Sequence, residues 1–300
     1  MSLLESIKKG PSTRPPKIML IGQEGVGKST AGAQMPNPVF LCGESGLVGP
    51  QFADTPSFTP SSWAESLAFC EELASNPSGY KSLVIDTLDL IEPMLYAHVV
   101  QAAKKNDIKH IEDFGYGKGY VIAQQEARKM LAVLDKVNAA GLAVLILSHS
   151  QLKTVKNPEG DDYDHFESKV NTKVAGIFKE WSDAVLFARF EIYVRKEGMK
   201  VKAQGGTERI VQTTHSAAWD AKNRYGLPEV MDLDMREIYT HIVAGKSTMG
   251  LMEDILVASE KMGKEKNDAT IKWADSKPTP YEIYACWKNL NKKTKEAKNA

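Results

Sequence analysis

The residues with the clearest chemical purpose lie near the start of the chain, in a glycine-rich turn that follows a short apolar run. Their spacing is Gly-x-x-x-x-Gly-Lys-Ser, which is typical of a phosphate-binding P-loop. The glycines let backbone N–H groups converge on a phosphate, Lys28 can reach the β- and γ-phosphates, and the Ser29 hydroxyl can bind Mg²⁺. The pattern predicts ATP and Mg²⁺ as cofactors. The predicted nucleotide-binding residues are Gly22, Gln23, Glu24, Gly25, Val26, Gly27, Lys28, Ser29 and Thr30.

A second metal-binding position follows further along the chain. Residues 82–86 form an apolar run that ends in Asp86, which is the Walker B pattern. In that pattern the carboxylate holds Mg²⁺ through water. An apolar strand ending in Asp is common by itself, but its position downstream of a P-loop makes it much more specific. The predicted magnesium residues are therefore Ser29 and Asp86.

These residues must be positioned by the strands that precede them. The expected strands are residues 18–21, 38–43, 82–86 and 142–147, and the expected helices between them are residues 63–73, 94–105 and 121–138. Continuous apolar strands that alternate with helices predict an α/β fold, with a mostly parallel sheet covered on both faces. Ligands bind such sheets at the carboxyl ends of the strands. Gly22, Glu44, Asp86 and His149 all follow strand ends, so we expect them to converge on one site.

Composition limits the classes of protein that the chain can represent. The 300 residues are 42% hydrophobic, which is enough for a full core, and the 38 basic and 38 acidic residues cancel. A balanced charge gives no global nucleic-acid signature, so a polyanion would need a local basic patch. Three scattered cysteines show no metal-ligand spacing, and no signal peptide or membrane span is visible. We therefore expect a cytoplasmic protein that has no contact with a membrane.

The second half of the chain is less regular. We expect a polar loop at 151–171, a strand at 184–194 and helices from residue 235 onward. A hairpin at 196–206 and residues 208–213 are expected to extend the sheet in antiparallel fashion. Residues 244–248 imitate the end of a P-loop, but Thr240 stands where the first glycine is needed and no strand precedes it. We reject that motif. The expected division is an N-terminal lead-in or inter-subunit arm (1–16), a nucleotide-binding core (17–245) and a helical extension (246–300).

The order of these motifs resembles the RecA-type ATPase core. It looks most similar to the phage RecA-like single-strand annealing ATPases of the Sak group (the fourth class), over roughly residues 15–245. The resemblance implies that Glu44 orients or deprotonates the attacking water, although Cys42 replaces the first acid of the family pattern. It also implies that His149 senses the γ-phosphate. Without the resemblance, Glu44 would be a surface residue and His149 a structural one.

The resemblance also implies where DNA would bind. RecA proteins keep two DNA-binding loops, and the matching places here are residues 114–120 and 151–171. Aromatic side chains can stack on bases while lysines contact phosphates, which suits single strands. The predicted DNA-binding residues are Phe114, Tyr116, Lys118, Tyr120, Lys153 and Lys156. A glycine turn packed by aromatic side chains is the alternative for the first loop.

A basic turn at residues 222–228 resembles a RecA segment whose two basic residues reach the γ-phosphate of a neighbouring subunit. Lys222 and Arg224 would then act in trans, and catalysis would require a filament or ring. A solvated basic turn is the alternative.

The predicted function is an ATP-dependent recombinase or annealing protein of phage type in a bacterial host. Its expected partners are single-stranded DNA, further copies of itself and a single-strand-binding protein. Two alternatives stay open: a nucleotide-gated oligomeric module that does not bind DNA, and a RecA-fold ring motor or helicase.

Overall fold

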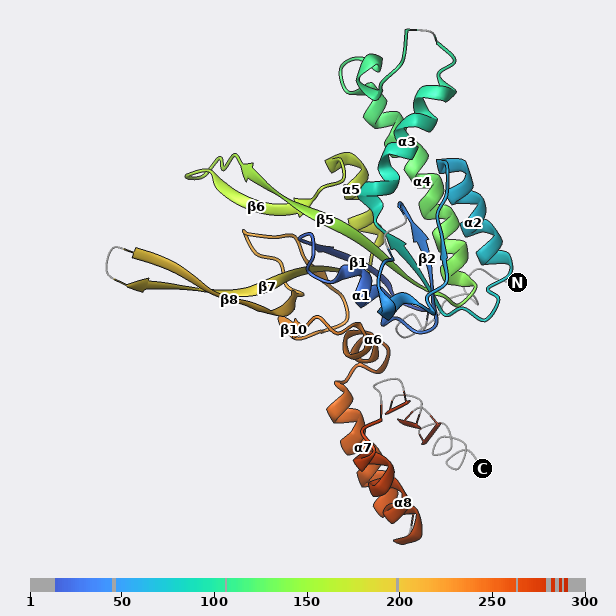
Figure 1. Ribbon diagram of the computed structural model, residues 1–300, viewed down its shortest axis with the longest axis vertical. Coiled ribbons are helices and arrows are strands. Elements are labelled where there is room, and N and C mark those ends of the chain that lie inside the picture. The colour runs from blue at the N-terminus through green and yellow to red at the C-terminus, as the bar shows by residue number, and fades with distance from the viewer. Residues whose placement is uncertain are drawn as a thin grey trace, which may run out of the picture.

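The computed structural model describes residues 14–44, 47–105, 107–197, 200–262, 264–278, 282–283, 286–287 and 289–290. Most of the predicted N-terminal arm and much of the helical extension lie outside these residues. In the described part, a sheet with the strand order β10-β8-β7-β1-β5-β4-β2-β3 occupies the centre (Figure 1). Its strands are β1 (Lys17–Gly22), β2 (Pro38–Cys42), β3 (Ser57–Phe58), β4 (Ser82–Asp86), β5 (Ala143–Val155), β7 (Ala184–Glu197), β8 (Lys200–Gln212) and β10 (Val230–Asp232).

The sheet is mostly parallel, as the sequence predicts. Strands β2, β3, β4, β5, β1 and β7 pair in parallel, and β8 and β10 join in antiparallel fashion. Gly22 lies level with His149 on β5 and with Ala188 on β7. This register brings the end of β1 beside the residues that follow the apolar part of β5.

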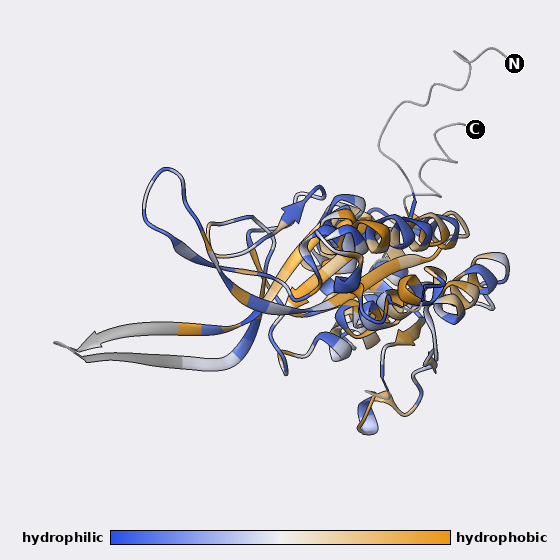
Figure 2. Cartoon of the chain, turned by 90° about the horizontal axis from the view of Figure 1, so that it is seen from above, coloured by the Kyte–Doolittle hydropathy of each residue, from blue (hydrophilic) through white to orange (hydrophobic). Residues whose placement is uncertain are grey.

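Alternate residues of β1 pack into two apolar layers, one on each face of the sheet. Met19 and Ile21 join the layer that also contains α2 (Trp63–Ser75), α3 (Leu88–Ala102), α4 (Lys118–Ala139) and α5 (Thr172–Trp181). Ile18 and Leu20 join the layer that contains α1 (Lys28–Ala33) and α6 (Met235–Ala244). Figure 2 shows the apolar strands enclosed between these helices. The continuous apolar character of the strands therefore reflects burial on both faces.

The predicted polar loop at 151–171 is wrong. Strand β5 continues to Val155 and pairs in antiparallel fashion with β6 (Tyr163–Ser168), which makes a hairpin beyond the edge of the sheet. We call residues 150–168 the sensor hairpin, after the role that the family resemblance predicts for His149 at its base. Its strands are largely exposed and rich in charged residues, so no buried pattern marks them in the sequence.

The other antiparallel hairpin is longer than predicted. Strands β7 and β8 run from Ala184 to Glu197 and from Lys200 to Gln212, and both hairpins extend on the same side of the molecule (Figure 1). The register shifts between Phe190 and Ile192. Two short elements complete the core: β9 (Lys222–Asn223) pairs with the start of β7, and the 3₁₀ turns are η2 (Pro50–Phe52) and η3 (Ile111–Phe114).

Helix α3 begins earlier than predicted. The sequence places its start near residue 94, after Pro93, whereas the helix begins at Leu88, directly after β4. Pro93 lies inside the helix, where proline lacks the N–H for one intrahelical hydrogen bond, so the sequence signal for a helix is weak there. The earlier start places Asp89 and Glu92 on the first turns of the helix, next to the end of β4.

The C-terminal helices α7 (Thr248–Glu260) and α8 (Lys264–Asp275) extend away from the sheet (Figure 1). Their apolar side chains, including Leu251 and Ile255, pack with Ile283 in a separate small cluster. Gly245 ends α6 with a φ of 70°, and the Ser247 side chain caps α7. Residues 244–248 therefore join two helices, which confirms that they are no P-loop. None of the described helices is long and apolar enough to cross a membrane.

Candidate functional site

The P-loop connects β1 to α1, and its glycines serve two different purposes. Gly25 and Gly27 have φ values of 73° and 99°, a region that side chains rarely adopt. Gly22 instead allows close packing, because a Cβ there would lie 2.7 Å from the carbonyl oxygen of Ala188. The three glycines together let the loop turn from the sheet into the N-terminus of α1, where backbone N–H groups attract anions.

Lys28 is almost fully buried at the start of α1. Its Nζ donates hydrogen bonds to the carbonyl oxygens of Gly22 at 3.0 Å and Gln23 at 2.9 Å. Burial lowers the pKa of Lys28 to about 8, although the carboxylates of Asp89, Asp86 and Glu24 act in the opposite direction. A nucleotide phosphate would supply a full negative charge where Lys28 now has only carbonyl oxygens.

Asp86 and Ser29 lie together across the mouth of the loop. Burial raises the pKa of Asp86 above its usual value, and the neighbouring Ser29 hydroxyl acts in the opposite direction. A hydroxyl and a carboxylate oxygen are hard donors that suit Mg²⁺, which usually shares its shell with nucleotide phosphates and water. Among the described residues, no group of three or more His, Cys, Asp or Glu side chains could hold a metal alone. The donor set therefore fits a metal that arrives with a nucleotide.

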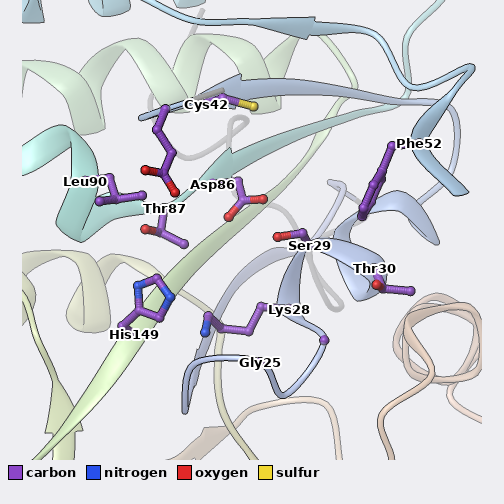
Figure 3. A pocket seen from close by; sticks show the side chains of 12 residues that line it. Gly25, Lys28, Ser29, Thr30, Cys42, Phe52, Asp86, Thr87, Leu90 and His149 are labelled. Atoms are coloured by element: carbon purple, nitrogen blue, oxygen red, sulfur yellow. The ribbon is translucent and has the colours of Figure 1, made fainter. Parts of the chain in front are cut away.

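A cavity of about 240 Å³ joins these residues to two further predicted ones (Figure 3). Its walls are formed by Gly25, Gly27, Lys28, Ser29, Thr30, Cys42, Glu44, Phe52, Asp86, Thr87, Leu90 and His149. The structure thus brings the P-loop, Glu44, Asp86 and His149 together, as their positions at strand ends predict. Phe52 and Leu90 are apolar walls that no sequence signal identified.

His149 is held in place by Asp89, which is not among the predicted site residues. Its Nδ1 lies 2.7 Å from Asp89 Oδ2, and its backbone N–H donates to Asp89 Oδ1 at 2.8 Å. Burial raises the pKa of Asp89, but the hydrogen bonds from His149 outweigh it and leave that pKa below its ordinary value. Asp89 is therefore an ionised acceptor, so His149 Nδ1 carries a proton. The Nε2 atom remains available on the cavity side.

The base of the sensor hairpin is attached to His149. The buried hydroxyls of Ser148 and Ser168 are 2.8 Å apart, and the backbone N–H of Lys169 donates to the His149 carbonyl at 2.8 Å. Glu92 on α3 accepts a hydrogen bond from the backbone N–H of Asn171 at 2.9 Å. These bonds connect the wall of the cavity directly to the hairpin and to the start of α5.

The predicted DNA-binding residues of the first loop divide into two pairs. Phe114 and Tyr120 pack against the core, and the Tyr120 hydroxyl donates to Glu112 at 2.5 Å. Both side chains are half-buried. Tyr116 is fully exposed in a left-handed conformation with a φ of 47°, and Lys118 is exposed at the start of α4. Binding of DNA by these four residues stays a prediction.

The two lysines of the second predicted loop lie on the sensor hairpin and face carboxylates. Lys153 Nζ is 3.1 Å from Glu167 Oε1, and Lys156 forms an ion pair with Asp162. All four side chains reach solvent to some extent, so these are weak surface pairs that a stronger anion could replace. Their role in binding DNA stays a prediction.

The structure places Lys222 and Arg224 at the opposite edge of the sheet, where β9 pairs with the first residues of β7. Lys222 Nζ donates to the carbonyl oxygens of Lys179, Glu180 and Ser182 at 3.2, 3.0 and 2.6 Å. Lys222 thus caps the end of α5 in its own subunit. The Arg224 side chain is 61% exposed, with Nη1 3.7 Å from Asp183 Oδ1. The action of Lys222 and Arg224 in trans stays a prediction.

The chain matches one protein-family model, and its structure is similar to solved structures of other proteins. The family model described as AAA domain matches residues 14–225. The structure is similar to that of the RadB recombinase, with 15% identity and a TM-score of 0.38 over 66% of this chain and 80% of that one. It is also similar to the flagellar accessory protein FlaH from Methanocaldococcus jannaschii, with 8% identity and a TM-score of 0.33 over 66% and 77% of the two chains. Among curated proteins, none matches the chain.

Proposed function

Because the chain belongs to the AAA domain family of P-loop nucleoside triphosphatases, we propose that it hydrolyses ATP and uses the nucleotide state to control binding of single-stranded DNA. The annealing ATPases of the phage Sak group, which its motif order resembles, are the specific class proposed. The observation that supports hydrolysis best is the cavity itself. It combines a phosphate loop, a Ser29–Asp86 pair suited to Mg²⁺, Glu44 as a base and His149 as a donor.

The hydrolytic step needs little covalent chemistry from the protein. Water attacks the γ-phosphorus, its proton passes to the Glu44 carboxylate, and the bond to the ADP oxygen breaks as ADP leaves. Lys28 would exchange the two carbonyl oxygens that it now contacts for phosphate oxygens. Mg²⁺, when bound, would neutralise charge on the phosphates. Ser29 and Asp86 are the residues that would hold it.

His149 is suited to read the γ-phosphate. Since Nδ1–H is bonded to Asp89, Nε2 can donate to a phosphate oxygen only when the ring is protonated. The ring would then lie between two anions, the Asp89 carboxylate and the phosphate. Loss of the γ-phosphate would remove one of the two anions. The ring would then lose a partner each time ATP is hydrolysed.

The sensor hairpin is the element that would respond. It is joined to His149 through Ser148, Ser168 and Lys169, so a shift of His149 would be transmitted to its base. Tyr116 and Lys118 offer a fully exposed aromatic ring and a nearby cation for single-stranded DNA. Assembly on DNA would follow if Arg224 of one subunit completes the site of the next.

A second function is favoured by the charge of the sensor hairpin and the residues that follow it. Acidic residues outnumber lysines in this segment: Glu159, Asp161, Asp162, Asp164 and Glu167 against Lys153, Lys156 and Lys169. Leu152 and Tyr163 are exposed there as well, at 57% and 39%. An acidic surface with exposed apolar groups suits a protein partner better than DNA. A nucleotide-gated module that binds protein is therefore the alternative.

Two measurements separate these functions. The proposal predicts that ATP hydrolysis is stimulated by single-stranded DNA, and that a labelled oligonucleotide binds with salt-dependent affinity in the presence of ATP. Hydrolysis that is indifferent to DNA, with no change in oligonucleotide anisotropy, would favour the nucleotide-gated module instead.

A third experiment tests whether two subunits share one site. An Arg224→Ala variant mixed with a Lys28→Ala variant should regain part of the activity. Absence of that recovery would contradict action in trans.

A further inference from the structure

Strand β8 presents one arginine on the face that packs against α1. Val211 of β8 belongs to the same apolar layer as Val26 and Ala31 of the P-loop and α1. Side chains two residues apart on a strand share a face, so Arg209 lies on that face as well. In the sheet, Val211 pairs with Ala188 of β7, and Ala188 is level with Gly22 at the end of β1. Arg209 pairs with Phe190, which lies two residues further along β7 and therefore beyond the end of β1. Arg209 therefore stands at the level of the P-loop.

The guanidinium reaches the loop itself. A Cβ built on Gly27 would lie 3.0 Å from Arg209 Nη1 and 3.7 Å from Cζ. Gly27 immediately precedes Lys28 and is the N-cap of α1, within the P-loop pattern whose backbone surrounds nucleotide phosphates. The guanidinium thus occupies the space that a side chain at Gly27 would take, beside the phosphate-binding turn of its own subunit.

The charge of Arg209 is not compensated by the protein. Within the described part of the chain, no carboxylate forms an ion pair with it, and its nearest aromatic contact is Phe190, whose ring centre is 6.0 Å from Cζ. The side chain is exposed and no fold-stabilising pair holds it against Gly27. An exposed arginine without a partner, placed beside an anion site, is suited to bind that anion bidentately.

The local backbone explains this placement. Between the pairs Phe190–Arg209 and Ile192–Gly205, β8 has three unpaired residues against one in β7. Gly205 and Gly206 accept φ values of 101° and 93° at this irregularity. Bulges of this kind redirect the adjacent side chains, often beside functional sites. The irregularity ends one residue before Arg209.

We propose that Arg209 binds the α- and β-phosphates of the nucleotide held by its own P-loop. The proposal rests on the nucleotide binding proposed above and adds a contact in cis from β8, distinct from Lys28 and from Arg224 of a neighbour. The assignment to the α and β positions follows from Gly27, since the backbone of a P-loop surrounds these phosphates while the lysine reaches toward the γ-phosphate. Arg209 would then stabilise ATP and ADP equally.

The test is titration of the full-length protein with fluorescent ATP and ADP analogues. Arg209→Gln should weaken both by about tenfold to a hundredfold, as expected for loss of a charged hydrogen bond. Arg209→Lys should recover part of the loss. Arg128→Gln, which removes an exposed arginine from α4, is the matched control and should bind like wild type. Unchanged affinity in Arg209→Gln would overturn the proposal, and a loss confined to ATP would overturn the assignment to the α- and β-phosphates.

Two further measurements distinguish loss of the Arg209 contact from loss of the fold and from absence of nucleotide binding. Thermal unfolding of Arg209→Gln without nucleotide should match wild type, because the side chain is exposed. A weaker affinity that only accompanies a lower Tm would count against a direct contact. Failure of the wild-type protein to bind either analogue would instead refute nucleotide binding as such. Normal binding by wild type, with loss in Lys28→Ala but none in Arg209→Gln, would refute only the role of Arg209.

Discussion

The central sheet holds buried charged groups at two edges, one at the carboxyl ends and one at the amino ends of its parallel strands. The two edges hold these charges in opposite ways. At the carboxyl ends of the parallel strands, burial lowers the pKa of Lys28 and raises that of Asp86, so both are displaced toward their neutral forms. At the other edge, Asp183 accepts bidentate hydrogen bonds from Arg14 at 2.6 and 2.7 Å and one from Tyr225 at 3.0 Å. Burial raises the pKa of Asp183, but these bonds outweigh it and lower that pKa below its usual range.

The difference separates a binding site from a structural anchor. The Asp183 cluster satisfies its charges within the subunit, so nothing further is needed there. Lys28 and Asp86 lie in a cavity with incomplete compensation, and an anion with its metal would supply what is missing. Removing a charge should therefore impair function at one edge and stability at the other.

The largest expected effect is on turnover, from Glu44→Gln. Glutamine keeps the shape of the side chain but cannot accept the proton of the attacking water, so kcat should fall by about 10²- to 10⁴-fold. Steady-state phosphate release measures the change. Nucleotide affinity should stay near wild type, and a parallel loss of affinity would show that Glu44 supports the cavity instead of the reaction.

Lys28→Ala should weaken ATP binding by about a hundredfold or more, because the phosphates lose their principal cation. Calorimetric titration measures this loss. The free energy of unfolding should not fall in proportion, since the variant removes a charge that burial already disfavours. A large drop in Tm would contradict the comparison between the edges.

Asp183→Asn should have the reverse outcome. We expect a loss of about 2 kcal/mol in unfolding free energy, less than for a fully buried ion pair because the Arg14 side chain is 37% exposed. The wild-type carboxylate has a lowered pKa when folded, so its contribution exists above the unfolded pKa and is lost as pH falls through the folded value. Urea unfolding at neutral and acid pH measures both effects, and ATP affinity should be unchanged.

The smallest effect is a pH dependence of nucleotide affinity. The pKa of Lys28 is about 8 in the free protein, and bound phosphate must raise it, so binding takes up a proton above that pH. Affinity should decline above pH 8 by at most about tenfold per pH unit. Titrations between pH 7 and 9.5 measure the slope. The same slope in Lys28→Ala would assign it to another group.

Much of the site could be predicted because its markers are local. The P-loop glycines, Glu44, Asp86 and His149 each follow a strand, and parallel strands end at the same edge. The sensor hairpin was missed because its strands are exposed and charged and therefore lack a hydrophobic period. The start of α3 was predicted six residues too late, so Asp89 and Glu92 were placed before the helix and Asp89 was left without a role.

The sequence by itself determined the phosphate-binding loop, the mostly parallel sheet and the strand ends at which chemistry could occur. These depend on spacing and on the burial of continuous apolar runs, both of which are properties of short segments. Only the tertiary structure decided which side chains face one another. It paired His149 with Asp89, gave Lys222 to the end of α5 and placed Arg209 against Gly27. Such contacts join residues far apart in the chain, and their geometry arises only when the sheet is assembled.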